Sequence, residues 1–155
     1  MLGHLKELRQ LGLYNNNLSG TIPGNLARAR SIRFLNLEKN DLDGSIPLEI
    51  SMLRDLNTLV LMDNKLEGVI PIDQLAKTSI KYLGLSNNRF SSILQRSIGK
   101  LESLEYLYLD GNRLRGRIPA DIGRLRYLSK CCVAVDKRVQ GCPNRPSNLC
   151  VHFGI

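Results

Sequence analysis

Apolar residues recur along this chain with a period of 24 residues, which holds through five consecutive copies without an insertion. Within each copy two leucines flank one outward residue, as in Leu11-Gly12-Leu13, and this alternation predicts a short strand with one buried face. A glycine such as Gly20 then permits a bend, and a proline such as Pro23 excludes regular helix at its own position. The rest of each copy is long enough for only one or two turns of helix.

An asparagine follows each predicted strand, where the chain must turn. Its amide both donates and accepts hydrogen bonds, so we predict a structural role in satisfying backbone groups of that turn. These turn residues are Asn16, Asn40, Asn64, Asn88 and Asn112. One copy cannot bury its apolar side alone, whereas stacked copies can, and the sequence therefore predicts a solenoid.

The segment Leu8–Pro23, LRQLGLYNNNLSGTIP, resembles the plant-type subclass of the leucine-rich repeat family, whose pattern is LxxLxLxxNxLxGxIPxxLGxL. The resemblance extends from Leu5 to about Leu128. It implies an α/β repeat fold: a curved right-handed solenoid with a parallel sheet on its concave face. The convex side is then expected to hold short 3-10, helical and irregular segments.

Two parts of the chain follow from this period. Residues 1–128 are expected to form five repeats, and the first of them has no capping segment before it. Either the chain is a fragment of a longer protein, which we favour, or a partner covers the edge of the first repeat. Residues 129–155 hold a degenerate sixth strand and a cysteine-containing C-terminal cap or tail. Continuing the period places Cys131 and Val133 inward and Cys132 outward.

Two copies depart from the pattern on the predicted convex side. In residues 72–79, polar residues occupy columns that are otherwise apolar. In residues 92–97, Ser92 and Gln95 stand where glycine and proline are expected. We expect both segments to be locally irregular, while the conserved copy length preserves the register of the sheet.

All four cysteines lie near the C-terminal end, and the stretch Gln140–Cys150 is rich in turn-forming residues. An even count and this location favour a disulfide-bonded cap. Free thiols in a cytosolic protein are an alternative, and a zinc site is disfavoured because no C-x₂₋₄-C pair occurs. An adjacent pair is strained, so the connectivity is either Cys131–Cys142 with Cys132–Cys150 or Cys131–Cys150 with Cys132–Cys142.

Outward strand positions of the sheet hold five of the eight aromatic residues of the chain. Tyr82 and Tyr106 share a column on neighbouring strands, ~4.8 Å apart. Aromatic residues that a fold does not need predict a binding surface, although cross-strand tyrosines also stabilise sheets by ~0.2–1 kcal/mol. The candidate ligand-binding residues are Tyr14, Phe34, Asn36, Met62, Tyr82, Tyr106, Tyr108 and Asp110. Flanking charges of both signs favour a protein or peptide ligand.

The net charge of +8 has its densest basic stretch between Arg113 and Arg138. This stretch fits either a solvated convex face or an acidic partner such as an acidic polysaccharide. No nucleic-acid-binding motif accompanies it, so we expect no nucleic-acid partner. No apolar run reaches the ~18 residues of a membrane span, so membrane association is expected only through other parts of a longer protein. The sequon Asn17-Leu18-Ser19 is weak evidence for glycosylation because the repeat consensus already prescribes much of it.

The sequence holds no phosphate-binding, dinucleotide-binding, metalloprotease or serine-hydrolase motif, and its two histidines lie near opposite ends. We therefore expect no catalytic residue, cofactor or metal site. The leading hypothesis is the ligand-binding domain of an extracellular or cell-surface receptor-like protein, a receptor kinase ectodomain or a secreted inhibitor similar to polygalacturonase inhibitors. The alternative is an intracellular, cytoplasmic leucine-rich repeat scaffold for protein–protein interaction.

Overall fold

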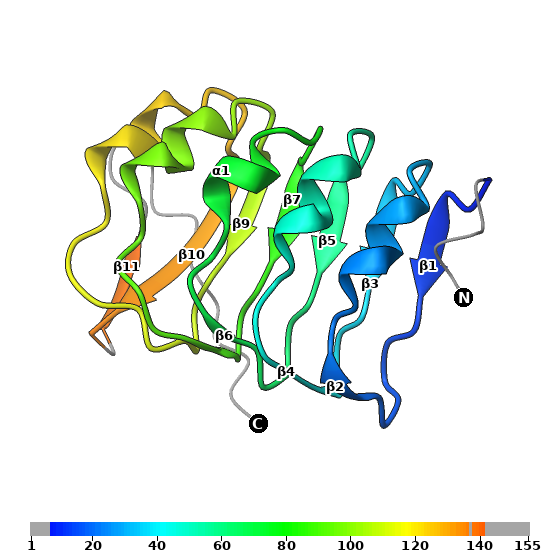
Figure 1. Cartoon of the computed structure of the whole chain (residues 1–155). Coiled ribbons are helices and arrows are strands. Elements are labelled where there is room, and N and C mark those ends of the chain that lie inside the picture. Colours follow the sequence, from blue (N-terminus) through cyan, green and yellow to red (C-terminus); the bar gives the residue numbers. More distant parts are fainter. Residues whose placement is uncertain (1–6, 137, 142–155) are drawn as a thin grey trace.

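The computed structural model describes residues 7–136 and 138–141, which wind into successive coils with strands along one side and short helices along another (Figure 1). The strands form one seven-stranded sheet in the order β1-β3-β5-β7-β9-β10-β11. Their bounds are β1 (Gln10–Gly12), β3 (Phe34–Asn36), β5 (Thr58–Val60), β7 (Tyr82–Gly84), β9 (Tyr106–Tyr108), β10 (Lys130–Val135) and β11 (Arg138–Gly141). Neighbours from β1 to β10 are parallel, and β11 runs antiparallel to β10.

The helical side of each coil is short, as the copy length requires. Four coils carry a five-residue 3-10 helix, and the third carries one turn of α-helix instead. The elements are η2 (Gly24–Arg28), η3 (Leu48–Met52), α1 (Ile72–Leu75), η4 (Arg96–Lys100) and η5 (Ala120–Arg124). The local irregularity expected in residues 72–79 is therefore present: this coil has a turn of α-helix where the other coils have a 3-10 helix.

The expected irregularity at residues 92–97 is wrong for the helical part of that segment. Gln95 has φ −70° and ψ 147°, close to the φ −65° and ψ 141° of Pro47 in the equivalent place. Because these angles are available to residues other than proline, η4 begins where the prolines of other coils would start it.

Two further parallel pairs, which the sequence did not predict, lie on a third side of the coils. They are β2 (Ser19–Thr21) with β4 (Asp41–Asp43), and β6 (Glu67–Gly68) with β8 (Arg89–Phe90). The glycine bends lie within or just after these strands. Gly20 and Gly68 have φ of 81° and 83°, in the left-handed region where a side chain is disfavoured.

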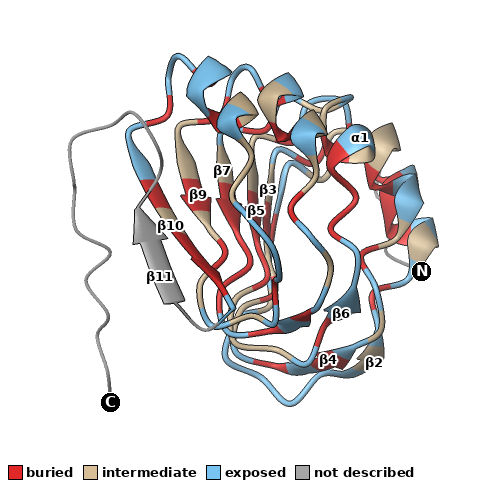
Figure 2. Cartoon of the chain, turned by 90° about the vertical axis from the view of Figure 1, so that its left-hand side faces the viewer, coloured by how far each residue is buried: buried red, intermediate tan, exposed pale blue. Residues whose placement is uncertain are grey.

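Between these three sides, the apolar columns fill one continuous interior, coloured red in Figure 2. The inward strand leucines Leu59, Leu83 and Leu107 are completely buried, with equivalent atoms stacked from coil to coil. Burying a leucine side chain stabilises a fold by ~1.5–3 kcal/mol. The solenoid is therefore held together by contacts between neighbouring coils.

The predicted turn asparagines link neighbouring coils. In the fourth coil, Asn88 Nδ2 donates to the backbone oxygen of Leu61 in the preceding coil at 2.9 Å, and to Leu85 in its own at 3.1 Å. Its Oδ1 accepts from the backbone N–H of Leu66 at 3.0 Å. Asn40, Asn64 and Asn112 repeat this arrangement. In the first coil, Asn16 donates only to carbonyls of its own coil.

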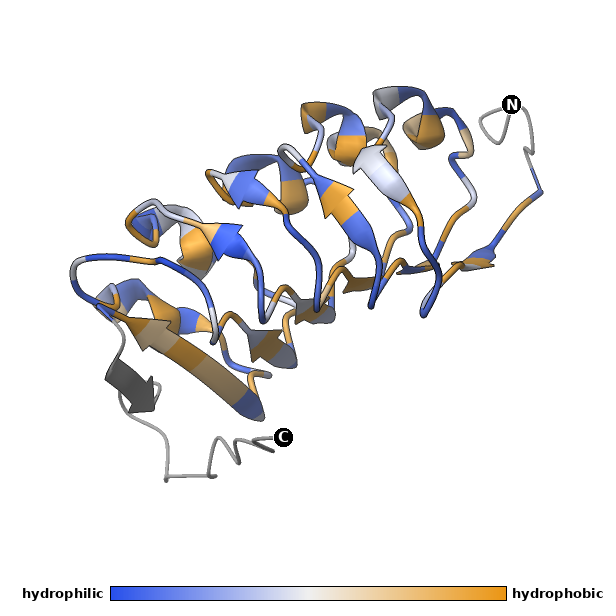
Figure 3. Ribbon diagram, turned by 90° about the horizontal axis from the view of Figure 1, so that it is seen from below, coloured by the Kyte–Doolittle hydropathy of each residue, from blue (hydrophilic) through white to orange (hydrophobic). Residues whose placement is uncertain are grey.

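The sixth strand exists as β10, with Cys131 and Val133 buried and Cys132 half-buried. Apolar residues run almost continuously along it (orange in Figure 3). The turn-rich assignment is wrong at its start, because Gln140 and Gly141 lie in β11. The four residues of β11 show no clear alternation of apolar and polar residues, so the sequence alone did not distinguish this strand from a turn. Cys142 and Cys150 lie outside the described residues.

Candidate ligand-binding site

Three tyrosine rings gather on the outward, concave face of the sheet. The register places Tyr82 of β7 opposite Tyr106 of β9, and their ring centroids are 5.6 Å apart with planes tilted by 33°. The ring of Tyr108 lies 5.5 Å from that of Tyr82, tilted by 39°. These separations are typical of interacting aromatic pairs. We call Tyr82, Tyr106 and Tyr108 the tyrosine cluster; all three are half-buried.

A glycine underlies this cluster. A Cβ atom at Gly84 would lie 3.1 Å from Cε1 of Tyr82 and 3.3 Å from Cε of Met62. The ring of Tyr82 therefore lies over the backbone of β7, with Met62 of the preceding coil against the same spot. The sequence analysis missed this role of Gly84, although a glycine in an outward strand column was the available signal.

Burial, together with nearby carboxylates, shifts the pKa values of two phenols of the cluster. Burial raises the pKa of the Tyr82 phenol, with smaller contributions from Tyr108 and the Glu38 carboxylate. Burial also raises the pKa of Tyr108, with smaller contributions from Tyr106 and Asp110. Asp110 accepts a hydrogen bond of 2.5 Å from Oγ of Ser86, which is buried. The hydrogen bond from Ser86, in the preceding coil, thus fixes the position of the Asp110 carboxylate beside the tyrosine cluster.

The other candidate residues lie apart from the cluster. Phe34 is half-buried on β3, two strands from β7. Asn36 serves the backbone, because its Oδ1 accepts from the N–H of Glu38 at 2.9 Å. Tyr14 is 60% exposed in the first coil. The structure thus brings together Met62, Tyr82, Tyr106, Tyr108 and Asp110, and spreads Tyr14, Phe34 and Asn36 over the same side of the solenoid.

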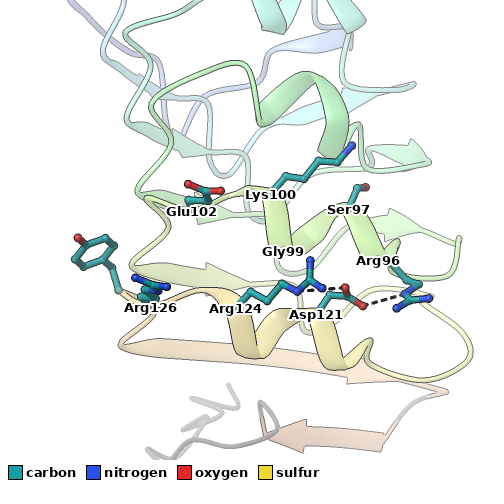
Figure 4. A pocket seen from close by; sticks show the side chains of 9 residues that line it. Arg96, Ser97, Gly99, Lys100, Glu102, Asp121, Arg124 and Arg126 are labelled. Carbon is teal, nitrogen blue, oxygen red and sulfur yellow. Dashed lines mark hydrogen bonds and ion pairs between the residues drawn. The ribbon is translucent and has the colours of Figure 1, made fainter.

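A second feature is a groove between η4 and η5 with a volume of about 860 Å³ (Figure 4). Asp121 accepts a hydrogen bond from Nε of Arg96 at 3.0 Å and lies 3.8 Å from Nε of Arg124. The hydrogen bond from Arg96 holds the pKa of Asp121 below its usual value. The groove is lined by Arg96, Ser97, Gly99, Lys100, Glu102, Asp121, Arg124, Arg126 and Tyr127. Cations outnumber carboxylates in it.

The close approach of these two helices depends on Gly99. A Cβ atom there would lie 2.9 Å from the backbone oxygen of Asp121, which is too near for a real side chain. Tyr127, at the edge of the groove, is 69% exposed. The excess of cations makes the groove a surface that suits an anionic partner.

An apolar groove of about 270 Å³ opens at the first coil, between leucines of the first two coils and Ile22. Its lining includes Leu11, Leu13, Leu18, Ile22, Leu26 and Leu42. Asn17, the residue of the glycosylation sequon, is exposed and directly precedes Leu18 of this lining.

Within the described residues, no group of histidine, cysteine, aspartate or glutamate side chains is arranged to hold a metal ion. The helices of that part of the chain are also too short and too polar to cross a membrane.

Comparison with known proteins identifies the class to which this solenoid belongs. A family model described as leucine rich repeat matches residues 54–114, and a second with the same description matches 7–29 and 31–53. Among curated proteins the comparison found no match. The chain belongs to the leucine-rich repeat family, and its structural relatives place it in the plant-type subclass that the motif predicted.

Three solved structures illustrate the likeness. The plant peptide hormone receptor RGFR1 in complex with RGF2 is 33% identical, with a TM-score of 0.83 over 86% of this chain and 22% of the receptor. PEPR1 in the PEPR1–AtPEP1 structure is 38% identical, with a TM-score of 0.79 over 83% of this chain and 18% of that one. A chain of the BIR3–SERK2 complex from Arabidopsis thaliana is 36% identical, with a TM-score of 0.70 over 86% of this chain and 72% of its own length. This chain therefore spans about a fifth of the two larger receptors.

Proposed function

We propose that this chain is a non-enzymatic recognition module that binds a protein or peptide ligand through the concave face of its sheet. The tyrosine cluster is the observation that carries the proposal. Its rings lie on the outward side of β7 and β9, whereas the interior is built from the leucines between them. Half-buried tyrosines supply large contact areas with few rotatable bonds, and they are enriched where proteins bind each other.

The relatives support this proposal through what their structures contain. RGFR1 is described with RGF2 and called a peptide hormone receptor, PEPR1 with AtPEP1, and BIR3 with SERK2. On that basis we propose an extracellular, receptor-like protein in which this chain supplies ligand recognition for signalling.

The test uses peptides selected from a random display library against the wild-type chain. The double substitution Tyr82→Ala with Tyr106→Ala should abolish binding of the selected peptides, measured by calorimetry, while the far-ultraviolet circular dichroism spectrum, which reports the backbone fold, stays unchanged. Tyr127→Ala is the matched control, because this tyrosine is exposed outside the concave face. Full binding by the double variant would exclude the tyrosine cluster as the contact surface.

A disulfide-bonded C-terminal cap belongs to the same proposal. Neither cysteine in the described part of the chain is a free thiol, which supports an oxidising environment over an intracellular scaffold. Thiol titration of protein purified from its native source distinguishes the two functions. No reactive thiols are expected for the receptor-like module, and four for a reduced scaffold.

The groove between η4 and η5 supports an acidic polysaccharide as a second class of partner. Binding of polygalacturonate, with uncharged dextran as the control, is the measurement. Arg124→Ala should weaken it, because this guanidinium lines the groove beside Arg96. If the chain bound polygalacturonate no more tightly than dextran, the groove would not be a polysaccharide-binding site and its basic residues would only be solvated.

A further inference from the structure

Two carboxylates flank the tyrosine cluster at the ends of the strands. Glu38 follows β3 and Asp110 follows β9, in the same column of the repeat. Both residues are half-buried, and each contributes to the raised pKa of a cluster phenol. Within residues 7–136, no lysine or arginine forms an ion pair with Glu38.

Cations of the concave side lie mostly at the opposite edge of the sheet, where the strands begin. Lys81 precedes β7 and is paired with Glu105 at 3.0 Å. Lys130 begins β10, beside Tyr106 in the register. Lys39 is adjacent to Glu38 and exposed in the following turn. Glu105 and Lys39 are exceptions to this division, but Glu38 and Asp110 both lie at the edge where the strands end.

The tyrosine cluster between these two edges of the sheet also attracts cations. The faces of tyrosine rings carry negative charge density and attract an ammonium or guanidinium group within about 6 Å of the ring centre. A guanidinium can also stack flat on a ring and direct its N–H groups to a carboxylate at the rim. The three rings are only half-buried, so part of each ring remains open to a ligand.

We propose that the tyrosine cluster with Glu38 and Asp110 is a subsite for an arginine or lysine side chain of the peptide ligand. This inference rests on the proposed function of the concave face and adds the chemistry that the face selects. The tilted rings give the contact area. The two carboxylates lie after β3 and β9, three strands apart in the sheet, and their combined negative charge makes an uncharged or acidic residue a poorer occupant. A basic peptide binds here although the chain as a whole is basic.

The experiment uses the same display selection on the intact chain, followed by sequencing of the peptides that the Tyr82→Ala, Tyr106→Ala variant fails to bind. These peptides should be enriched in arginine or lysine at one position. Replacing that arginine with citrulline, its uncharged isostere, should weaken binding, and so should Glu38→Gln or Asp110→Asn, by about two- to fivefold each. Asp43→Asn on β4, exposed on another side of the coil, is the control and should change nothing.

The outcomes separate this inference from the proposed function. Peptides that depend on the tyrosines but show no basic enrichment, or are indifferent to citrulline and to both carboxylate substitutions, would overturn the cationic subsite and leave the concave-face function standing. Failure to select any tyrosine-dependent peptide would overturn both. Thermal unfolding of each variant confirms that the comparison is made between folded proteins.

Discussion

The side chain of Asn88 donates a hydrogen bond of 2.9 Å to the backbone oxygen of Leu61, which lies in the preceding coil. The same amide bonds to two carbonyls of its own coil and accepts from the N–H of Leu66. A single 6%-exposed side chain therefore satisfies backbone groups of two coils that the strands leave unpaired. The turn asparagines therefore hold neighbouring coils together by hydrogen bonds, as the buried leucines do by apolar packing.

Replacing this asparagine should cost far more than its size suggests. Asn88→Ala leaves several buried backbone groups without partners, and we expect the free energy of unfolding to fall by about 2–4 kcal/mol. Asn16→Ala is the matched control, since Asn16 is exposed and bonds only within its own coil; its loss should be about 0.5–1 kcal/mol. Urea denaturation measures both, and equal losses would contradict a linking role.

The position of the Tyr82 ring should depend on Gly84. In Gly84→Ala the new methyl group meets Tyr82 and Met62 at 3.1–3.3 Å, so these side chains must shift by a few tenths of an ångström. We expect a changed near-ultraviolet circular dichroism spectrum with stability within about 1 kcal/mol of wild type, because alanine suits a strand better than glycine. Gly12→Ala is the control, where the nearest atom of Tyr14 lies at 3.8 Å. An unchanged spectrum in Gly84→Ala would show that the ring does not rest there.

The raised phenol pKa values give the cluster a signature in alkaline solution. Burial, then Tyr108 and Glu38, raise the pKa of Tyr82 above the usual 10.0 of a tyrosine phenol. The folded state therefore holds this proton more tightly than the unfolded state does. The resulting contribution to stability is present below about pH 10 and is lost as pH rises through the folded-state pKa.

Removing the neighbouring carboxylates tests the same environment residue by residue. Glu38→Gln should lower the pKa of Tyr82, and Asp110→Asn should lower that of Tyr108, whose causes include this carboxylate. The chain has five tyrosines and no tryptophan, so phenolate absorbance near 295 nm or NMR of labelled rings follows the titration directly. Unchanged titration in both variants would place the carboxylates too far away to form a common subsite.

The period of the sequence predicted which residues share a face because the copies contain no insertion. Tyr82 therefore stands opposite Tyr106, as expected from their spacing. Ring orientation was not predictable, because it depends on the missing side chain of Gly84 and on Met62 from another coil. Ion pairs such as that of Arg96 with Asp121 join positions 25 residues apart, and their geometry depends on how tightly Gly99 lets the helices approach.

The two cysteine connectivities differ in which partner Cys131 takes, and Cys142 and Cys150 lie outside the described residues. In the antiparallel pair of β10 and β11, Cys132 stands opposite Gly141 and Val133 opposite Gln140. In the sequence, Cys142 directly follows Gly141 and Cys131 directly precedes Cys132. We therefore predict the pairs Cys131–Cys142 and Cys132–Cys150, one of the two connectivities that the sequence leaves open.

Partial reduction with cyanylation of the released thiols, followed by mass spectrometry, identifies each bond even though two of the cysteines are adjacent. The first connectivity should be found, and Cys131→Ser with Cys142→Ser should lower the free energy of unfolding by about 2–4 kcal/mol. Cys132→Ser with Cys150→Ser is the matched comparison and should cost less, because Cys131 is buried against the last coil whereas Cys132 is half-buried. A Cys131–Cys150 fragment in the wild-type digest would contradict this prediction and identify the other connectivity.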